Sequence, residues 1–244
     1  MRALPLCLAF LLVPAVATAQ GERERGYLFQ APRATLSLYG GLVSPTTQSD
    51  LWQFTFDQFT LGRRDFLGFN RGVDLALAVG SRFDVVISFA NDAQSRQSES
   101  RDYVDQDDQP IQQRTELVRS AFGLGLRYSV LDKGRRIGSL SWIPARVVPH
   151  VGVSTGFLYY RFQQQGDFVD AETLEIFPDF YRSVGRTGYV RGEIGTGFTI
   201  SPSLVLNTEL RYLRAQGSVE PTFTGFQPLD LSGVTATLGF TIRL

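Results

Sequence analysis

The sequence predicts an all-β protein in which eight antiparallel strands, connected up and down, close into a transmembrane barrel. Three observations predict this fold. Apolar residues occupy every second position in eight segments after residue 19, and the connections between these segments mostly alternate between short and long. No segment after residue 19 shows a sustained helical stripe or the run of about 18 apolar residues that a spanning helix needs. Any membrane crossing must therefore use strands.

Residues 1–19 have the features of a secretory signal peptide, and we exclude them from the fold. An apolar stretch over residues 3–16 is followed at 17–19 by Ala-Thr-Ala, the small-x-small pattern that signal peptidase accepts. No linker or composition break interrupts the rest, so we expect one barrel domain over residues 20–244. The only cysteine, Cys7, lies in the signal segment, and the exported chain is expected to contain no disulfide.

The first three predicted strands, 35–42, 72–79 and 83–90, each have one face of large apolar side chains and one of small or polar side chains. The second and third strands are joined by three residues, and this odd number keeps both apolar faces on the same side. The apolar faces carry Leu36, Leu38, Leu42, Val73, Leu75, Leu77, Val79, Phe83, Val85, Ile87 and Phe89.

The fourth and fifth predicted strands cover 118–130 and 147–160. Their apolar faces include Phe122, Leu124, Leu126, Val151, Val153 and Phe157. Their second faces alternate glycine, alanine and serine with Arg119, Arg127 and His150. A strand tilted by about 40° needs roughly 10 residues to cross an apolar band of about 25 Å, and these segments are long enough.

The last three predicted strands cover 190–200, 204–212 and 233–244, and the final one alternates up to Leu244. Another three-residue link joins the first two of them and sets their register. That register places Glu193 opposite Arg211. We expect the two side chains to lie within hydrogen-bond reach of each other.

The second face of these strands decides between a soluble and a membrane barrel. Small residues interspersed with charged ones would make a poor core for a soluble sandwich, but they suit the narrow lumen of a barrel with lipid outside. We therefore predict an ionic network in the lumen. Its expected members are Asp74, Arg119, Arg127, Arg191, Glu193, Glu209 and Arg211.

The connections fit the same architecture, because outer-membrane barrels have short periplasmic turns and long external loops. Long connections are expected at 44–71, 94–115, 163–186 and 214–231. The link at 131–144 is longer than a periplasmic turn usually is.

Two segments carry a family resemblance. The sequence Pro-His-Val-Gly-Val-Ser-Thr-Gly at 149–156 resembles a strand start common in small eight-stranded outer-membrane β-barrels of the OmpA/OmpX-like type, the outer membrane protein β-barrel domain. Gly-Leu-Gly-Leu-Arg-Tyr at 123–128 resembles the neighbouring strand of that family, although Leu244 replaces the usual terminal aromatic residue. The resemblance implies a location in the bacterial cell outer membrane and contact with the outer-membrane assembly machinery. We expect a monomer.

Catalytic and cofactor sites are not expected. His150 and Ser154 share a strand face, but four residues along a strand span about 13 Å, too far for a base and its nucleophile. One histidine and no cysteine after residue 19 argue against soft-metal sites, and Asp105, Asp107 and Asp108 lack ordered ligand spacing. The formal net charge of +0 gives no electrostatic case for nucleic acid. We therefore predict no catalytic, cofactor-binding or metal-binding residue and no enzyme activity.

Aromatic residues are concentrated in two of the long connections. They include Trp52, Phe54, Phe56, Phe177 and Phe180. One interpretation is an interfacial girdle with strand extensions above the bilayer, and the other is a hydrophobic mouth that captures an apolar molecule or a partner surface.

Two functions remain open at this point. The first is a structural or interaction protein of the envelope or adhesion type, with a packed, charged lumen and loops that contact lipopolysaccharide, other outer-membrane lipid or other cells. The alternative is a narrow porin-like channel for small or hydrophobic solutes. The interior charges favour the first function, and the aromatic loops favour the second.

Overall fold

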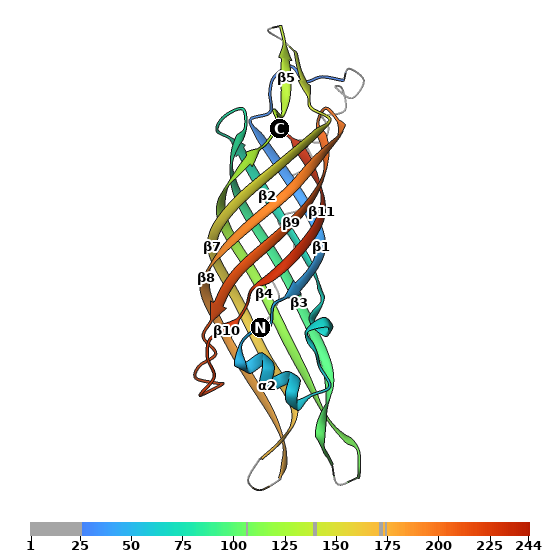
Figure 1. Ribbon diagram of the computed structural model, residues 1–244, viewed down its shortest axis with the longest axis vertical. Coiled ribbons are helices and arrows are strands. Elements are labelled where there is room, and N and C mark those ends of the chain that lie inside the picture. Colours follow the sequence, from blue (N-terminus) through green and yellow to red (C-terminus); the bar gives the residue numbers. More distant parts are fainter. Residues whose placement is uncertain (1–25, 106, 139–140, 171–172, 174) are drawn as a thin grey trace, which may run out of the picture.

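The computed structural model describes residues 26–244, except 106, 139, 140, 171, 172 and 174. The predicted signal peptide therefore lies outside the described residues. Eight antiparallel strands form a closed barrel (Figure 1), which confirms the predicted fold class. The barrel strands are β1 (Ala34–Pro45), β2 (Gly68–Ala78), β3 (Phe83–Val104), β4 (Pro110–Ser129), β7 (Val147–Val169), β8 (Ile176–Ser201), β9 (Leu204–Gly217) and β11 (Gly233–Arg243).

The barrel closes because the last strand pairs with the first. β11 lies between β9 and β1, with Leu38 opposite Phe240 in the β1–β11 ladder. Closure gives every strand two neighbours, so the backbone polar groups of the spanning part are satisfied without an open edge. No helix in the described part of the chain is long and apolar enough to cross a membrane.

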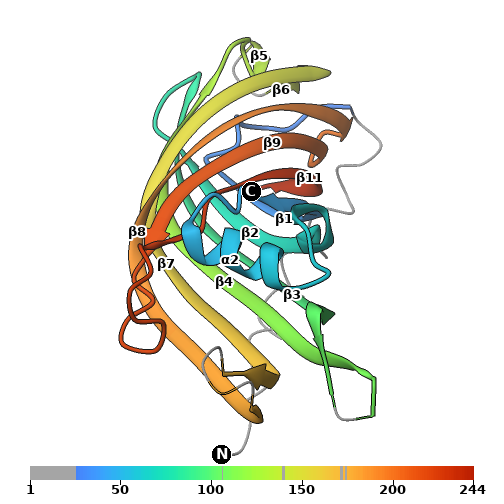
Figure 2. The ribbon, with the colours of Figure 1, turned by 60° about the horizontal axis from the view of Figure 1, so that its bottom comes forward.

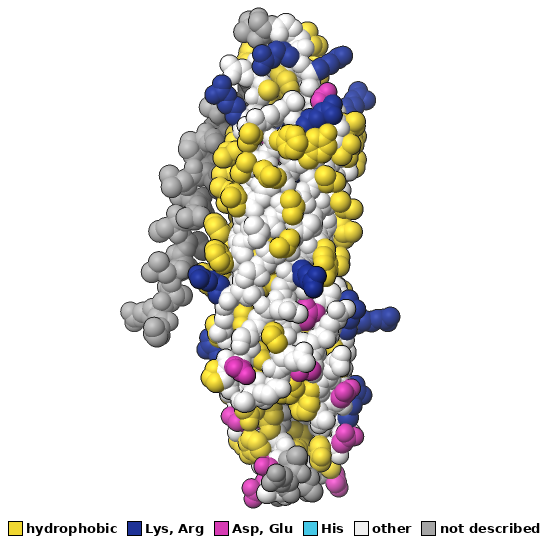
Figure 3. All heavy atoms as spheres, turned by 60° about the vertical axis from the view of Figure 1, so that its left-hand side comes forward, with side chains coloured by type: hydrophobic (Ala, Val, Ile, Leu, Met, Phe, Trp, Pro, Cys, Tyr) yellow, Lys and Arg dark blue, Asp and Glu magenta, His cyan; other side chains and the backbone are white. Residues whose placement is uncertain are grey.

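The pattern of burial is inverted relative to a soluble protein. Outward-facing Leu38, Val153 and Ile194 are more than half exposed, whereas inward-facing Asp74 and Arg211 are almost completely buried. Figure 3 shows hydrophobic side chains spread over the outer surface. This is the arrangement that the alternating sequence predicts, with the apolar face directed outward toward lipid.

The two ends of the barrel differ. At one end, called here the turn end, β2 is joined to β3 and β8 to β9 by tight links, and the 131–144 link forms a hairpin of β5 (Gly134–Ile137) and β6 (Ser141–Pro144). Trp142 of this hairpin is buried, and the guanidinium of Arg243 lies over its ring at 5.6 Å. The opposite end, called here the loop end, carries the other connections (Figure 1).

Two of the predicted long loops are mostly strand. The β3–β4 ladder continues to Glu99 opposite Gln112, and the β7–β8 ladder continues to Val169 opposite Ile176. The expected loops at 94–115 and 163–186 are therefore wrong. These segments are extended hairpins. They lie beyond the lipid and lack the regular alternation of apolar and polar residues, so the sequence pattern did not reveal them as strands.

The first long connection folds over the barrel opening (Figure 2). It contains the helix α2 (Asp50–Gln58) and the 3-10 helix η2 (Arg63–Phe66), while the short strand β10 (Leu229–Asp230) pairs with β9 in the last connection. The sequence pattern did not reveal α2, although it rightly excluded a spanning helix. Trp52, Thr55, Phe56 and Phe59 do follow helical spacing, but over only two turns, too few to form a sustained stripe.

Candidate functional site

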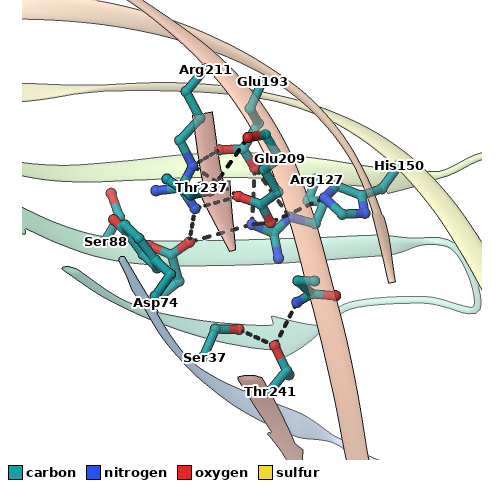
Figure 4. Close-up of polar contacts among 12 residues, drawn as sticks. Ser37, Asp74, Ser88, Arg127, His150, Glu193, Glu209, Arg211, Thr237 and Thr241 are labelled. Atoms are coloured by element: carbon teal, nitrogen blue, oxygen red, sulfur yellow. Dashed lines mark hydrogen bonds and ion pairs between the residues drawn. The ribbon is translucent and has the colours of Figure 1, made fainter. Parts of the chain in front are cut away.

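Charged side chains from four strands meet inside the barrel and cross its bore (Figure 4). This group, called here the ionic layer, contains three carboxylates and three guanidinium groups, so its formal charges balance. All six side chains are buried. The members are Asp74 from β2, Arg127 from β4, Arg191 and Glu193 from β8, and Glu209 and Arg211 from β9.

Two arginines connect the three carboxylates. Nη2 of Arg127 lies 3.0 Å from Glu193, 3.3 Å from Glu209 and 3.4 Å from Asp74. Nη2 of Arg211 lies 2.7 Å from Oδ2 of Asp74 and also donates to Glu209. Each carboxylate therefore contacts more than one cation, which compensates for the desolvation of buried charges.

The predicted pair of Glu193 and Arg211 is only partly as expected. The β8–β9 register does place the two residues opposite each other. However, Nε of Arg211 lies 3.8 Å from Oε2 of Glu193, an ion pair beyond hydrogen-bond reach, so the expected hydrogen bond is wrong. The guanidinium of Arg211 instead turns toward Asp74 and Glu209 and stacks over Tyr39 at 4.0 Å.

His150 lies at the edge of the ionic layer. Its Nε2 is 3.2 Å from Oε1 of Glu209, and its side chain is buried. Oγ of Ser154 has no hydrogen-bond partner among the described residues, so it is not activated by the imidazole. This arrangement matches the interpretation of His150 as a lumen-filling residue.

Arg119 is the one predicted network member that lies apart from the ionic layer. Its Nε is 2.9 Å from Oδ1 of Asp92, and its Nη1 donates to the carbonyl of Leu231 at 2.6 Å. Sequence reasoning missed Asp92 because the third predicted strand ends at residue 90. Continuing its alternation by one more inward position would have found this partner.

A small cavity of about 40 Å³ separates this pair from the ionic layer, and its lining includes Asn70, Asp92, Arg119, Arg191 and Arg211. Because about 10–15 Å³ of such space is enough to hold one water molecule, this cavity has room for only a few waters. The ionic layer therefore leaves no wide opening toward the loop end.

Beyond Arg119 the opening is filled by apolar side chains, called here the mouth core. Trp52 of α2 is completely buried, and its ring packs edge-on against Phe66 at 4.7 Å and Phe162 at 5.2 Å between centroids. Strand residues complete the core from the barrel wall. The other fully buried members with the largest side chains are Leu51, Leu117, Leu158, Leu229, Leu231 and Val219.

Asp230 joins the first and last connections above the mouth core. Its carboxylate accepts hydrogen bonds from Thr46 and from the backbone amides of Gln48 and Ser232, the latter two at 3.0 Å. Its backbone carbonyl accepts a hydrogen bond from Nε1 of Trp52 at 3.1 Å. Burial alone would raise the pKa of Asp230, but the hydrogen bonds to the carboxylate lower this pKa below its ordinary value.

The five aromatic residues predicted at the mouth have different positions. Trp52 is buried, which contradicts the girdle interpretation for this residue, and Phe56 stacks beside it at 5.8 Å. Phe54 and Phe180 are each 47% exposed, and Phe177 packs near Phe168 at 6.3 Å. Most of this set therefore takes part in packing within the loop end, and only two members offer a large exposed surface.

The described residues contain no cluster of three or more potential metal ligands. In the β3–β4 tip, the carboxylate of Asp105 accepts hydrogen bonds from the backbone amides of Asp107 and Gln109, each at 2.8 Å. This is the usual role of an aspartate that caps a turn. The interior therefore holds mutually neutralised charges next to a buried apolar core.

Comparison with known proteins adds information on the fold. No family model and no curated protein matches the sequence. Among solved structures, the chain is similar to the outer membrane protein OprG from Pseudomonas aeruginosa, with 10% identity, a TM-score of 0.50, and coverage of 89% of this chain and 99% of that chain. It is also similar to Neisserial surface protein A (8% identity, TM-score 0.44, 88% and 99% covered) and to the outer membrane protease OmpT from Escherichia coli (10% identity, TM-score 0.41, 73% and 63% covered).

The inverted surface and these likenesses concern architecture rather than activity. The closed eight-stranded ring, the inverted surface and the likeness to OprG show that the chain has the fold of the small eight-stranded β-barrels of the bacterial outer membrane.

Proposed function

We propose that this protein is a non-conducting barrel that acts as a structural or interaction protein of the outer membrane. The observation that carries the proposal is the double closure of the bore by the ionic layer and the mouth core. The proposal includes no catalytic role.

The ionic layer opposes the passage of a solute because its charges are already paired. A solute that crossed this level would have to separate Arg127 from Glu193 or Arg211 from Asp74, pairs held at 3.0 Å and 2.7 Å. Breaking a buried pair leaves an uncompensated charge and costs about 3–5 kcal/mol. A passing solute would then still have to displace Trp52 and its neighbours from the mouth core.

The extended hairpins support an interaction role. β3 pairs with β2 only as far as Ala93 but continues to Val104, and β8 begins at Ile176 although its pairing with β9 starts at Tyr189. Both hairpins thus project well past the barrel wall, as Figure 1 shows. Ordered strands at this position offer a contact surface that a channel does not need.

Planar-bilayer recordings test whether the barrel is closed. The wild-type protein is expected to give no stable conductance steps, and flotation of vesicles from the same preparation would show that it is inserted. Stable steps from the inserted wild-type protein would overturn the proposal in favour of the narrow porin-like channel.

Shortened hairpins test the interaction role. Residues 100–111 can be replaced by Asn-Gly, which joins the paired residues Glu99 and Gln112, and residues 166–179 can be replaced in the same way between Gln165 and Phe180. We expect cells that carry the doubly shortened barrel to lose adhesion to host-cell or abiotic surfaces relative to wild type, while the heat-dependent gel shift of the folded barrel remains. Unchanged adhesion at equal surface amounts would contradict the interaction role.

A further inference from the structure

Two outward-facing arginines lie among exposed apolar side chains in the loop-side part of the barrel wall, on neighbouring strands. Along the outward face of β9, apolar Leu210 and Tyr212 are followed toward the loop end by Arg214. On the outward face of β8, Arg186 lies two outward positions beyond Val190 toward the loop end. Both arginines are exposed, and neither points into the bore.

Their surroundings are apolar. Arg214 is opposite Val190 in the β8–β9 ladder, and Arg186 is opposite Tyr159 in the β7–β8 ladder. The guanidinium carbon of Arg186 lies 4.8 Å above the ring of Phe157. Each cation is therefore placed against side chains that face the acyl region of a membrane.

Neither guanidinium forms an ion pair with a described residue. No carboxylate of the described residues lies within 4.0 Å of Arg186 or Arg214. Arg161, on the outward face of β7, shows the contrast, because its Nη2 is 2.6 Å from Glu116. Arg71 on β2 is a further exposed arginine that pairs with no carboxylate of the described residues, but it lies on a different part of the wall.

The charges on this side of the molecule are also ordered along the barrel axis. Figure 3 shows Lys and Arg side chains at the turn end and around the middle of this face, and Asp and Glu side chains mainly between the middle and the loop tips. Cations next to an apolar band lie at the depth of lipid headgroups, whereas the acidic groups lie farther out in water.

We propose that Arg186 and Arg214 bind the headgroup phosphates of a phosphorylated lipid in the leaflet that surrounds the loop end. A guanidinium can give two parallel N–H donors to one phosphate, and it is less strongly hydrated than an ammonium group. Phe157, Tyr159 and Val190 then contact the acyl chains of the same lipid. The proposal identifies a lipid-binding face on β7, β8 and β9, independently of whether the bore conducts.

The test compares lipid binding by detergent-solubilised wild-type barrel and by the double variant Arg186→Gln/Arg214→Gln, with bisphosphorylated lipid A as the probe. Native mass spectrometry measures the affinity. The double variant should bind about thirtyfold more weakly. The matched control is Arg135→Gln/Arg136→Gln, which removes the same charge from two exposed positions of the β5 strand at the turn end and should leave the affinity unchanged.

Two further measurements separate the alternatives. Dephosphorylated lipid A should bind wild type and the double variant equally, since the lost contact is with phosphate. An excess of inorganic phosphate should not displace the lipid, because free phosphate makes none of the acyl contacts that also hold the lipid. The proposal would be overturned if the double variant keeps the heat-dependent gel shift and still binds bisphosphorylated lipid A as tightly as wild type does. It would also be overturned if the Arg135→Gln/Arg136→Gln control lost as much affinity as the double variant.

Discussion

The ionic layer and the mouth core close the same bore by opposite chemistry. The ionic layer uses paired charges from strands, such as Asp74 with Arg211 at 2.7 Å, whereas the mouth core uses apolar side chains carried largely by connections, such as Trp52. The difference follows from what surrounds each level. Within the membrane the apolar side chains are directed outward to lipid, so polar groups must fill the interior.

Above the membrane the same barrel wall is surrounded by water, and the usual distribution of a soluble protein returns. Leu117 and Phe162 point inward there and are buried, and the first connection supplies Trp52 and Phe66 to cover them. One continuous set of strands therefore changes from an inverted to an ordinary pattern along its length.

The largest effect is expected from a neutral substitution in the ionic layer. Asp74→Asn would leave Arg211 and Arg127 without one of their carboxylate partners and should lower the free energy of unfolding by about 3–5 kcal/mol. Urea titration of the barrel in lipid vesicles measures this loss. The matched control, Asp132→Asn, affects an exposed pair with Arg82 and should leave the urea midpoint unchanged. A midpoint for Asp74→Asn equal to that of wild type would refute the structural importance of the ionic layer.

A second substitution should act locally, on the mouth core. Trp52→Ala removes a fully buried ring and should destabilise the docked first connection by about 3 kcal/mol, because a cavity is left between Phe66 and Phe162. Since the connection can open without unfolding the barrel, trypsin cleavage at Arg63 and Arg64 should become about 100-fold faster.

The wider opening should still not conduct, since the ionic layer is unchanged. Phe54→Ala is the control, because this ring on the same helix is 47% exposed. Equal cleavage rates for the two variants would show that Trp52 does not hold the connection in place, and conductance steps in Trp52→Ala would show that the mouth core alone closes the bore.

The smallest expected effect concerns pH and the contact between the two connections. The pKa of Asp230 is lowered in the folded protein, so its carboxylate contributes stability above the unfolded pKa of about 4, and this contribution is lost as the pH falls through the lower folded pKa. The loss should be about 1 kcal/mol, the usual net contribution of an intramolecular hydrogen bond to stability.

Fluorescence of Trp52 in a Trp142→Phe background measures this transition, since the sequence contains only these two tryptophans. The fluorescence should change reversibly below about pH 4 in the Trp142→Phe protein that retains Asp230. It should be flat over the same range in Asp230→Asn, where no carboxylate titrates at this position. An identical transition in both proteins would assign it to another group.

The sequence determined which residues face outward and which face inward in the spanning part, because a strand has period two and a closed barrel has one lipid face. This is why Asp74, Glu193 and Arg211 could be assigned to the lumen. The alternating pattern could not predict which hydrogen bonds these side chains form. Arg211 can reach Glu193, Glu209 or Asp74, and the orientation of its guanidinium also depends on its contact with Tyr39.

Only the tertiary structure decided how the loop end is closed. The period-two pattern of apolar residues ends where the lipid ends, so the extension of β3 to Val104 and of β8 back to Ile176 left no signal that could be separated from a polar loop. The helix α2 has two turns, and its burial depends on a receiving surface formed by residues more than 100 positions away, such as Phe162. Short elements of this kind are stabilised by packing rather than by intrinsic propensity, so their structure becomes evident only when the whole chain is folded.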